Sequence, residues 1–418
     1  MKINRRQFGI TSVLAASAVA GRTSPNEKLN VAFIGAGGRG ASNLREFTGE
    51  NIVAFCDVDD RRAAATYKKH PDVPRYRDYR RMLDKLDRQI DGVVISAPNH
   101  IHAPASELAM RMGKHVYCEK PLSHSIAEAR SMARLAKQTG LATQMGTQIH
   151  ASENFRRIVE LIQSGAIGEV KSVHLRLPSG RGRNDRPPER PPVPAELDWN
   201  LFVGPAPMRP YHPIYVPHGW HYWWDFGGGS LGNMGCHYLD LVFWALKLRA
   251  PKTISARGPK PHVESTPANL SVKWTFEREK SDPLEITWDH GWEQTPIWTQ
   301  HKFPKWAWGV FVGSKGMLLV NYPQHALWPE GGLDLASVKP DPWIPKSIGH
   351  HREWIEACKN GSKTSCNFDY ASTLTECVHL GNLAFRTGKQ LHWNPATMSI
   401  PNVPQAEELL QREYRKGW

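Results

Sequence analysis

Three polar residues have types and positions that suit proton transfer. Lys120 stands in CEKP (residues 118–121), directly after an apolar run typical of a parallel strand. A lysine at that end of a strand can exchange a proton with a hydroxyl, because burial lowers the pKa of its amine. Asn233 and His237 lie four residues apart in GGGSLGNMGCHYLD (residues 227–240), which places them on one helix face. Taken singly, each stretch is better explained by a surface lysine or by a structural histidine.

A second group of residues suits the binding of a dinucleotide. Gly35, Gly37 and Gly40 form G-x-G-x-x-G between an expected strand and an expected helix, where the pyrophosphate would rest on the helix amino terminus. Asp57 follows the next expected strand, 22 residues after Gly35. A carboxylate there binds a ribose diol and repels a 2′-phosphate, which predicts NAD, while the nearby Arg39 leaves NADP possible.

Aromatic residues crowd the stretch YHPIYVPHGWHYWWDFGGG (residues 211–229) immediately before His237. Aromatic faces match the apolar faces of sugar rings, although ordinary packing explains such residues equally well. The three histidines of the stretch match no common zinc spacing, so no metal is predicted. The predicted substrate-contacting residues are Tyr215, His218, His221, Trp223, Trp224, Asn233 and His237.

The elements that must position these residues fall into two patterns. Strand and helix signals alternate up to about residue 150, which predicts a doubly wound parallel sheet. Period-two stretches such as LSVKWTF and LEITWDH then predict an open, mainly antiparallel sheet. The expected divisions are a signal and linker (1–28), a Rossmann domain (29–150), a substrate and oligomerisation domain (151–345) and C-terminal helices with a tail (346–418).

The first residues resemble an export signal. Arg5 and Arg6 precede an apolar run of eleven residues, Ile10 to Ala20, which is shorter than the roughly 20 residues needed to span a bilayer. Ala18 and Ala20 offer a small-x-small cleavage site, so the mature chain is expected to start near Gly21. This order of features predicts twin-arginine export to the periplasm.

Composition narrows the possible partners. Part of the net charge of +13 lies in the signal and much of the rest in SGRGRNDRPPERPP (residues 179–192). A solvated loop is the favoured interpretation of that stretch, and attraction of an anionic sugar is the alternative. No nucleic-acid motif accompanies the charge, and no later stretch is long and apolar enough for a membrane span. The six cysteines lack CxxC spacing, which predicts buried free thiols.

Taken together, GAGGRG, APNHIH (residues 97–102), EKP and GGGSLGNMGCHYLD resemble the Gfo/Idh/MocA family. The resemblance implies an NAD(P)-binding Rossmann domain, hydride transfer at a sugar or polyol carbon, and pairing of subunits through the second sheet as a dimer or tetramer. It assigns Lys120 as acid–base group and His237 as the substrate-binding, proton-relaying histidine. Many relatives have aspartate at the place of Asn233. The expected cofactor contacts are Gly35, Gly37, Gly38, Arg39, Gly40, Asp57, Pro98, Asn99, His102, Glu119, Lys120 and Gln148.

Three functions remain open from the sequence. The first is oxidation and reduction of a sugar or polyol with a tightly bound cofactor. The second, which some relatives of this family carry out, is cleavage of glycosides by oxidation, elimination, addition of water and reduction. Both return the cofactor to its starting state, which suits an exported protein. The third is a carbohydrate-binding protein without catalysis.

Overall fold

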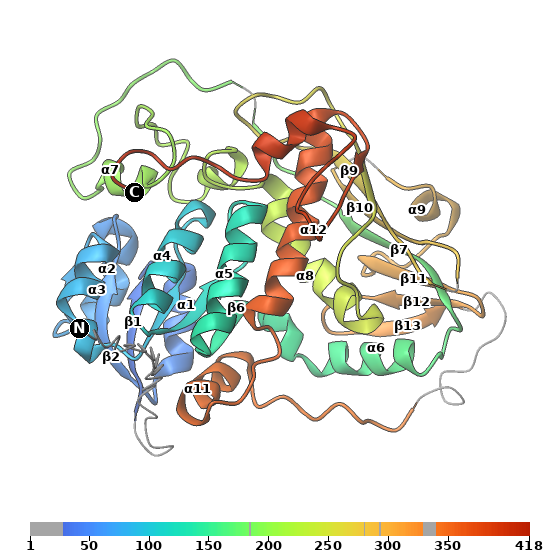
Figure 1. The fold of residues 1–418 in the computed structure, drawn as a ribbon, viewed down its shortest axis with the longest axis horizontal. Coiled ribbons are helices and arrows are strands. Elements are labelled where there is room, and N and C mark those ends of the chain that lie inside the picture. Colours follow the sequence, from blue (N-terminus) through green and yellow to red (C-terminus); the bar gives the residue numbers. More distant parts are fainter. Residues whose placement is uncertain (1–27, 184, 280, 292–293, 329–339) are drawn as a thin grey trace, which may run out of the picture.

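The computed structural model describes residues 28–183, 185–279, 281–291, 294–328 and 340–418. The predicted twin-arginine signal falls in residues 1–27, outside the described residues. The chain forms two sheets with helices packed between and around them (Figure 1). Among the described helices, none has the length and apolar content that crossing a bilayer requires.

The first sheet is the predicted doubly wound parallel sheet, with strand order β3-β2-β1-β4-β5-β6. Its strands are β1 (Asn30–Ile34), β2 (Asn51–Cys56), β3 (Arg75–Tyr76), β4 (Gly92–Ile95), β5 (His115–Glu119) and β6 (Thr143–Gly146). The helices around it are α1 (Arg39–Leu44), α2 (Asp60–Lys69), α3 (Tyr79–Lys85), α4 (Asn99–Arg111) and α5 (Ile126–Thr139). The sequence pattern missed β3, because a strand of two residues has no periodicity.

Local signals set the ends of helix α5. Ser125 accepts a hydrogen bond from the Glu128 amide, and the Glu128 carboxylate accepts one from the Ser125 amide. The helix ends at Gly140, which has a φ of 66° in the left-handed region that favours glycine. Helix α5 therefore starts a fixed distance after Lys120 and holds the end of β5 in place.

The second sheet has the order β13-β12-β11-β7-β10-β9-β8-β14. Its strands are β7 (Val170–Leu177), β8 (Thr253–Arg257), β9 (Leu270–Phe276), β10 (Leu284–His290), β11 (Gly309–Gly313), β12 (Met317–Val320), β13 (His325–Trp328) and β14 (Leu391–His392). Among the described strands of this second sheet, only β7 and β10 pair in parallel, so the sheet is mainly antiparallel as expected.

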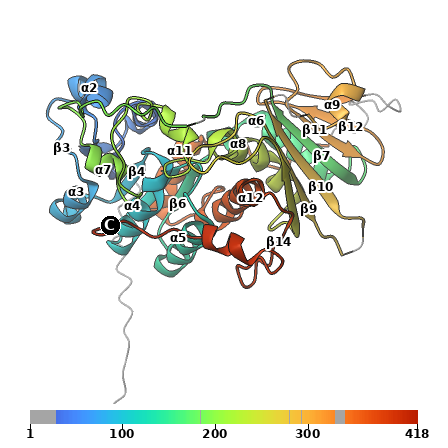
Figure 2. The same ribbon diagram turned by 90° about the horizontal axis from the view of Figure 1, so that it is seen from above.

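Further helices join the two sheets. They are α6 (Glu153–Gln163), α7 (Trp199–Val203), α8 (Gly229–Leu246), α9 (Ile297–Gln300), α11 (His350–Asn360) and α12 (Phe368–Thr387). Short 3₁₀ helices occupy Arg45–Phe47, Asp87–Gln89, Gln148–Ala151, Gly219–Tyr222 and Pro404–Leu409. Figures 1 and 2 show α8 and α12 between the two sheets.

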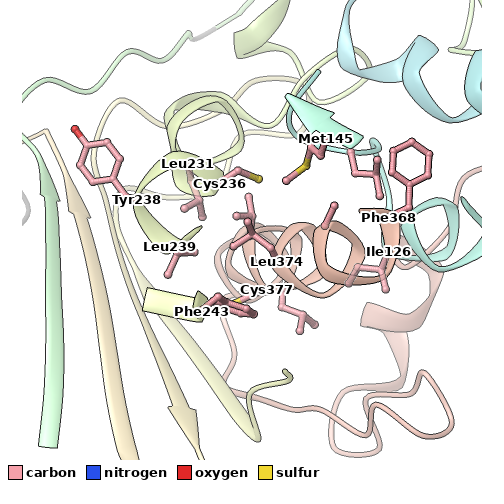
Figure 3. Packing of buried hydrophobic residues seen from close by; sticks show 14 of the residues in the cluster. Ile126, Met145, Leu231, Cys236, Tyr238, Leu239, Phe243, Phe368, Leu374 and Cys377 are labelled. Carbon is pink, nitrogen blue, oxygen red and sulfur yellow. The ribbon is translucent and has the colours of Figure 1, made fainter. Parts of the chain in front are cut away.

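Helices α8 and α12 form the centre of the largest core. Leu231, Cys236 and Leu239 of α8 face Leu374 and Cys377 of α12 (Figure 3). All five side chains are buried, which places one end of α8 rigidly against both sheets. This packing fixes the helix that carries Asn233 and His237. All six cysteines are buried and unpaired, as predicted.

Helix α11 completes the core of the first sheet, although it lies some 200 residues further along the chain than β6. Trp354 is fully buried and meets the rings of Phe47 and Tyr117 at 5.8 and 6.1 Å between centroids. Residues 346–418 contain α11, α12 and β14, and the α11 part of them belongs to the core of the Rossmann domain.

Two tryptophans of the second sheet, Trp274 and Trp288, are covered by helices of the same chain. The Trp274 indole donates to the Cys377 carbonyl at 2.9 Å, and Trp288 packs on Tyr238, so both point toward the helices. Trp298 of α9 covers part of the opposite face, where Lys273 and Glu285 form an ion pair. Residues of the same chain thus bury these rings.

Candidate active site and dinucleotide cleft

A cavity of about 360 Å³ opens between the first sheet, the segment 199–221 and the start of α8. It lies at the carboxyl ends of β1, β2, β4 and β5, where open parallel sheets bind ligands. The predicted residues that line it are Gly35, Gly37, Gly38, Arg39, Asp57, Pro98, Asn99, His102, Glu119, Lys120, His218, His221, Asn233 and His237.

The glycines of the turn after β1 stand where a side chain would collide with neighbouring backbone atoms. A Cβ on Gly35, whose φ is 87°, would lie 2.7 Å from the Ser96 carbonyl, and one on Gly40 would collide with the Gly35 carbonyl. Gly40 thus serves the close packing of turn and helix and does not itself line the cavity. The turn and the cavity fit the pyrophosphate of a dinucleotide, which lies against such a backbone.

Asp57 marks one end of this cleft. Its carboxylate accepts hydrogen bonds from the Ala36 and Gly37 amides at 2.8 and 3.1 Å, and it lines the cavity. Burial raises the pKa of the Asp57 carboxyl, while the amide hydrogen bonds lower it. The acidic group sits where a ribose diol is bound in dinucleotide sites, and it disfavours a 2′-phosphate there.

The Arg39 side chain is held away from the Asp57 end of the cleft. Its guanidinium lies 3.2 Å from Glu119 and also binds Gln148. Gln148 in turn donates to Glu119 at 2.7 Å and does not line the cavity, so it supports Glu119 from behind. Arg39, because of which NADP remained a possible cofactor, thus lies at the Lys120 end of the cleft. It is away from the Asp57 carboxylate, which would bind the ribose.

Two predicted residues anchor the loop after β4. The ring nitrogens of His102 lie 2.7 and 2.8 Å from the carbonyl oxygens of Pro121 and Ala97, which ties the ends of β5 and β4 together. Pro98 and Asn99 start α4 and line the cavity beside them. These contacts hold the backbone before and after Lys120 in a fixed place.

Lys120 and Asn233 meet at the other end of the cleft. The Lys120 ammonium group donates to the backbone oxygen of Asn233 at 2.6 Å and to its side-chain oxygen at 2.7 Å. Burial is the main cause that lowers the pKa of the Lys120 amine. A lysine whose pKa falls toward neutrality can accept a proton from a hydroxyl.

Two neutral histidines share this end of the cavity. The Nδ1 atoms of His237 and His221 are buried and have no hydrogen-bond partner among the described residues. Burial lowers the pKa of His237 well below its usual value, and lowers that of His221 to about 3, with Lys120 adding to both shifts. Because both imidazole rings line the cavity, they suit hydroxyl groups, which both donate and accept hydrogen bonds.

Three predicted substrate contacts lie elsewhere. Tyr215 and Trp223 are buried with Phe226 in an aromatic cluster of the 197–226 segment, and they do not line the cavity. The Trp224 indole donates to the His262 carbonyl on the far side of that segment. These rings pack against one another, because a segment with this many aromatics builds a core of its own.

The arginine-rich stretch does not line the cavity either. Arg186 pairs with Glu264 at 2.9 Å, and Arg183 lies over the ring of Tyr222. These arginines therefore give no reason to expect an anionic substrate. Near the site, His150, Asp240 and Cys366 come within 4.8 Å of one another, but His150 and Tyr370 already hydrogen-bond Asp240.

The sequence patterns missed several residues that line the cavity. They are Arg62, Arg77 and Tyr79 of the first domain, Phe202 and Trp220 of the next segment, and Trp418. Arg62 lies against Gly37 and Gly38 and approaches the ring of His218 at 3.3 Å. Nothing in the local sequence marks these residues, since their neighbours come from distant parts of the chain.

Comparisons with known proteins agree with this geometry. Residues 29–147 match the oxidoreductase family with an NAD-binding Rossmann fold, and residues 178–282 match its C-terminal alpha/beta domain. Inositol 2-dehydrogenase of Salmonella paratyphi B is 29% identical over 154 residues, which is 35% of this chain and 45% of that protein. Glycosyl hydrolase family 109 protein 1 of Shewanella sp. (strain ANA-3) is 30% identical over 166 residues, 37% of this chain and 36% of that protein.

The chain therefore spans less than half the length of these curated relatives. The WlbA dehydrogenase of Bordetella pertussis, solved with NADH and UDP-GlcNAcA, has the same fold with a TM-score of 0.64. It is 14% identical, over 88% of this chain and 99% of that chain. The two matched domains, in their expected order, show that this chain belongs to the Gfo/Idh/MocA family of oxidoreductases and that residues 29–147 are its NAD-binding Rossmann domain.

Proposed function

We propose that the protein is an NAD-dependent oxidoreductase acting on a sugar or polyol hydroxyl. The observation that carries the proposal is the buried Lys120 amine in the cavity, bound to Asn233 and beside His237. NAD, when bound, supplies a group that accepts a hydride from the substrate carbon and returns it. The name of the inositol 2-dehydrogenase relative supports a polyhydroxylated substrate.

In this proposal Lys120 transfers the proton, and other residues position the amine and the substrate. Lys120 in its neutral form takes the hydroxyl proton as the carbon is oxidised, and returns it when a carbonyl is reduced. Asn233 holds the amine by two oxygen atoms, which fixes the direction of its lone pair. His221 and His237, whose rings line the cavity, bind neighbouring hydroxyls. The asparagine cannot take a proton, so the transfer ends on Lys120.

A second candidate is redox-neutral cleavage of a glycoside, which the glycosyl hydrolase family 109 relatives support. In that reaction a ring hydroxyl is oxidised, the glycosidic group leaves by elimination, water adds, and the carbonyl is reduced again. Lys120 serves the first and last of these steps in the same way. The two reactions need the same site and differ in their substrates.

One experiment separates the candidates. The purified protein, loaded with NAD, is mixed with panels of free sugars, polyols and glycosides while absorbance and products are followed. An oxidoreductase changes the nicotinamide absorbance with one sugar and restores it with a second. A glycosidase releases an aglycone with no net absorbance change. A carbohydrate-binding protein without activity does neither and contradicts both proposals.

We also propose export by the twin-arginine route to the periplasm, with NAD preferred over NADP. The arginine pair ahead of a short apolar run supports the first, and Asp57 at the ribose end supports the second. The Arg5→Lys, Arg6→Lys variant should stay in the cytoplasm in cell fractionation, with its nucleotide bound. Its appearance in the periplasm would contradict the route. Formation of a homo-oligomer, dimer or tetramer, stays a prediction, which light scattering of the purified protein checks.

A further inference from the structure

Residues 411–418 leave the helical part of the chain and cross to the first domain. In Figure 1 this red segment runs from the α12 side to the point marked C beside α7, and Figure 2 shows that point beside α4. The segment is distant in sequence from every element it meets there. Its course therefore raises the question of what holds it at this place.

Hydrogen bonds fasten the segment at three points. Arg412 and Tyr414 both donate to the Glu128 carboxylate of α5, at 2.7 and 2.8 Å. Arg415 donates from its backbone amide to the Pro205 carbonyl and from its guanidinium to the Asn200 side chain, at 2.9 and 2.7 Å. The segment is thus joined both to the first domain and to α7.

The third fastening carries Trp418 into the cleft. The Arg80 guanidinium donates to the Gly417 carbonyl at 3.0 Å and lies 4.0 Å from the centre of the Trp418 ring. Asp78 holds the same guanidinium from its other side. The Trp418 ring lines the cavity next to Tyr79, at 6.4 Å between ring centroids.

This end of the cavity is the adenosine end. Arg77, Asp78 and Tyr79 follow β3, and they line the cavity together with Asp57, which follows the neighbouring β2. In dinucleotide folds the acidic residue after the second strand binds the adenosine ribose. The opposite end, at Lys120, is where the reacting ring must lie. Trp418 therefore stands on the half of the cleft that takes no part in the reaction.

Residues 411–418 also complete the wall of the cavity that α7 forms. Leu201 and Phe202 of α7 line the cavity opposite the first domain, and the neighbouring Asn200 is the residue that Arg415 binds. Residues 196–198 pair with the loop after β2, where Asp198 donates to the Val58 carbonyl at 2.8 Å. Two separate pieces of chain thus cover the same end, and Arg415 joins them.

We propose that residues 411–418 close the adenosine end of the dinucleotide cleft, with the Trp418 ring against the adenine, and that this closure slows the exchange of NAD. The inference rests on the proposed binding of NAD and not on the reaction at Lys120. Aromatic rings stack well on bases, and a segment that must detach before the cofactor can leave retards its release.

The test measures release of NADH from the full chain without any sugar present. Protein loaded with NADH is mixed with a large excess of NAD, and the fall of NADH fluorescence gives the release rate. Trp418→Ala should release NADH about tenfold faster or more, because it removes the stacking surface. Arg415→Ala should also release it faster, because the segment loses its fastening to α7. Trp418→Phe should restore most of the slow release.

Controls keep the result separate from folding and from catalysis. Trp343→Ala, at a tryptophan that is 49% exposed, should release NADH at the unchanged rate. The release assay contains no sugar and needs no turnover, so a failed catalytic proposal leaves this one intact. Wild-type release rates in both Trp418→Ala and Arg415→Ala would overturn the proposal. A chain that binds no NADH would overturn it together with the proposed function.

Discussion

Lys120 donates to Asn233 through both oxygen atoms of that residue, at 2.6 and 2.7 Å, so the amine is held by a neutral amide. An amide orients the amine but adds no negative charge beside it. Burial therefore acts on the pKa of Lys120 without a carboxylate at position 233 to oppose it. Compared with an aspartate at this position, Asn233 therefore leaves the pKa of Lys120 lower.

The Asn233→Asp variant should lower oxidation at pH 7. A carboxylate beside the ammonium favours its charged form and raises the pKa of Lys120, by about one to three units. Because only the neutral amine accepts a proton, each unit lowers the active fraction about tenfold below the pKa. The measurement is kcat/KM for oxidation against pH, where the rising limb should move to higher pH. An unmoved limb would show that residue 233 does not set the charge of the lysine.

Lys120→Met and Lys120→Arg should both lose turnover, by about a hundredfold to ten-thousandfold. Methionine keeps the length without the amine, and arginine keeps a charge that cannot be removed. Both variants should retain bound nucleotide, which mass spectrometry of the denatured protein shows. Full turnover in the arginine variant would indicate that charge, not proton transfer, is what the site needs.

Oxidation, measured from pH 5 to 10, should rise with pH through the ionisation of Lys120, because burial lowers the pKa of its amine below the ordinary value. The amine of Lys120 becomes competent as it deprotonates, so the rate increases up to its pKa and then levels. Burial lowers the pKa of His237 well below its usual value and that of His221 to about 3, so both stay neutral over this range. A second limb near pH 6.5 that disappears in His237→Gln would contradict this assignment.

Asp57→Asn should weaken the preference for NAD over NADP by about tenfold, since it removes the charge that repels a 2′-phosphate. The asparagine oxygen can still accept from the Ala36 and Gly37 amides, so the turn should keep its shape. Titration of both nucleotides into nucleotide-free protein gives the ratio. Asp57→Ala is the comparison variant, and it should also lose about 1–3 kcal/mol of stability because buried amides lose their acceptor.

The sequence was informative where the residues of the site lie close together in the chain. Gly35 with Gly37, Lys120 with Glu119, and Asn233 with His237 each lie within a few residues of one another, and the structure brings all of them to the cavity. Strand β3 was missed because two residues have no period. Helix α11 was predicted as a helix, but not as part of the first core.

The remaining residues of the site could not be predicted locally. Trp418 and Tyr79 meet across more than 300 residues, and no spacing rule connects them. Tyr215 and Trp223 were assigned to the substrate because an aromatic stretch has the same composition whether it lines a pocket or packs on itself. Only the tertiary contacts distinguish these two possibilities.

Trp354→Ala should destabilise the first domain by about 3–5 kcal/mol, the cost of truncating a fully buried large aromatic ring. Chemical denaturation, followed by bound NADH fluorescence, measures the change. Trp343→Ala is the matched control on an exposed ring, and it should change the free energy of unfolding by no more than about 0.5 kcal/mol. Equal effects of the two substitutions would mean that α11 adds nothing to the Rossmann core.

The docking of α11 against Phe47 and Tyr117 bears on how the protein is made in the cell. A ribosome releases residues 28–147 well before it synthesises Trp354, so the part of the nascent nucleotide-binding domain that α11 covers stays exposed until then. The sheet acquires its last cover only when nearly the whole polypeptide is available. Loading of the cofactor would then follow completion of synthesis, and a chain interrupted before α11 would lack a finished nucleotide-binding domain.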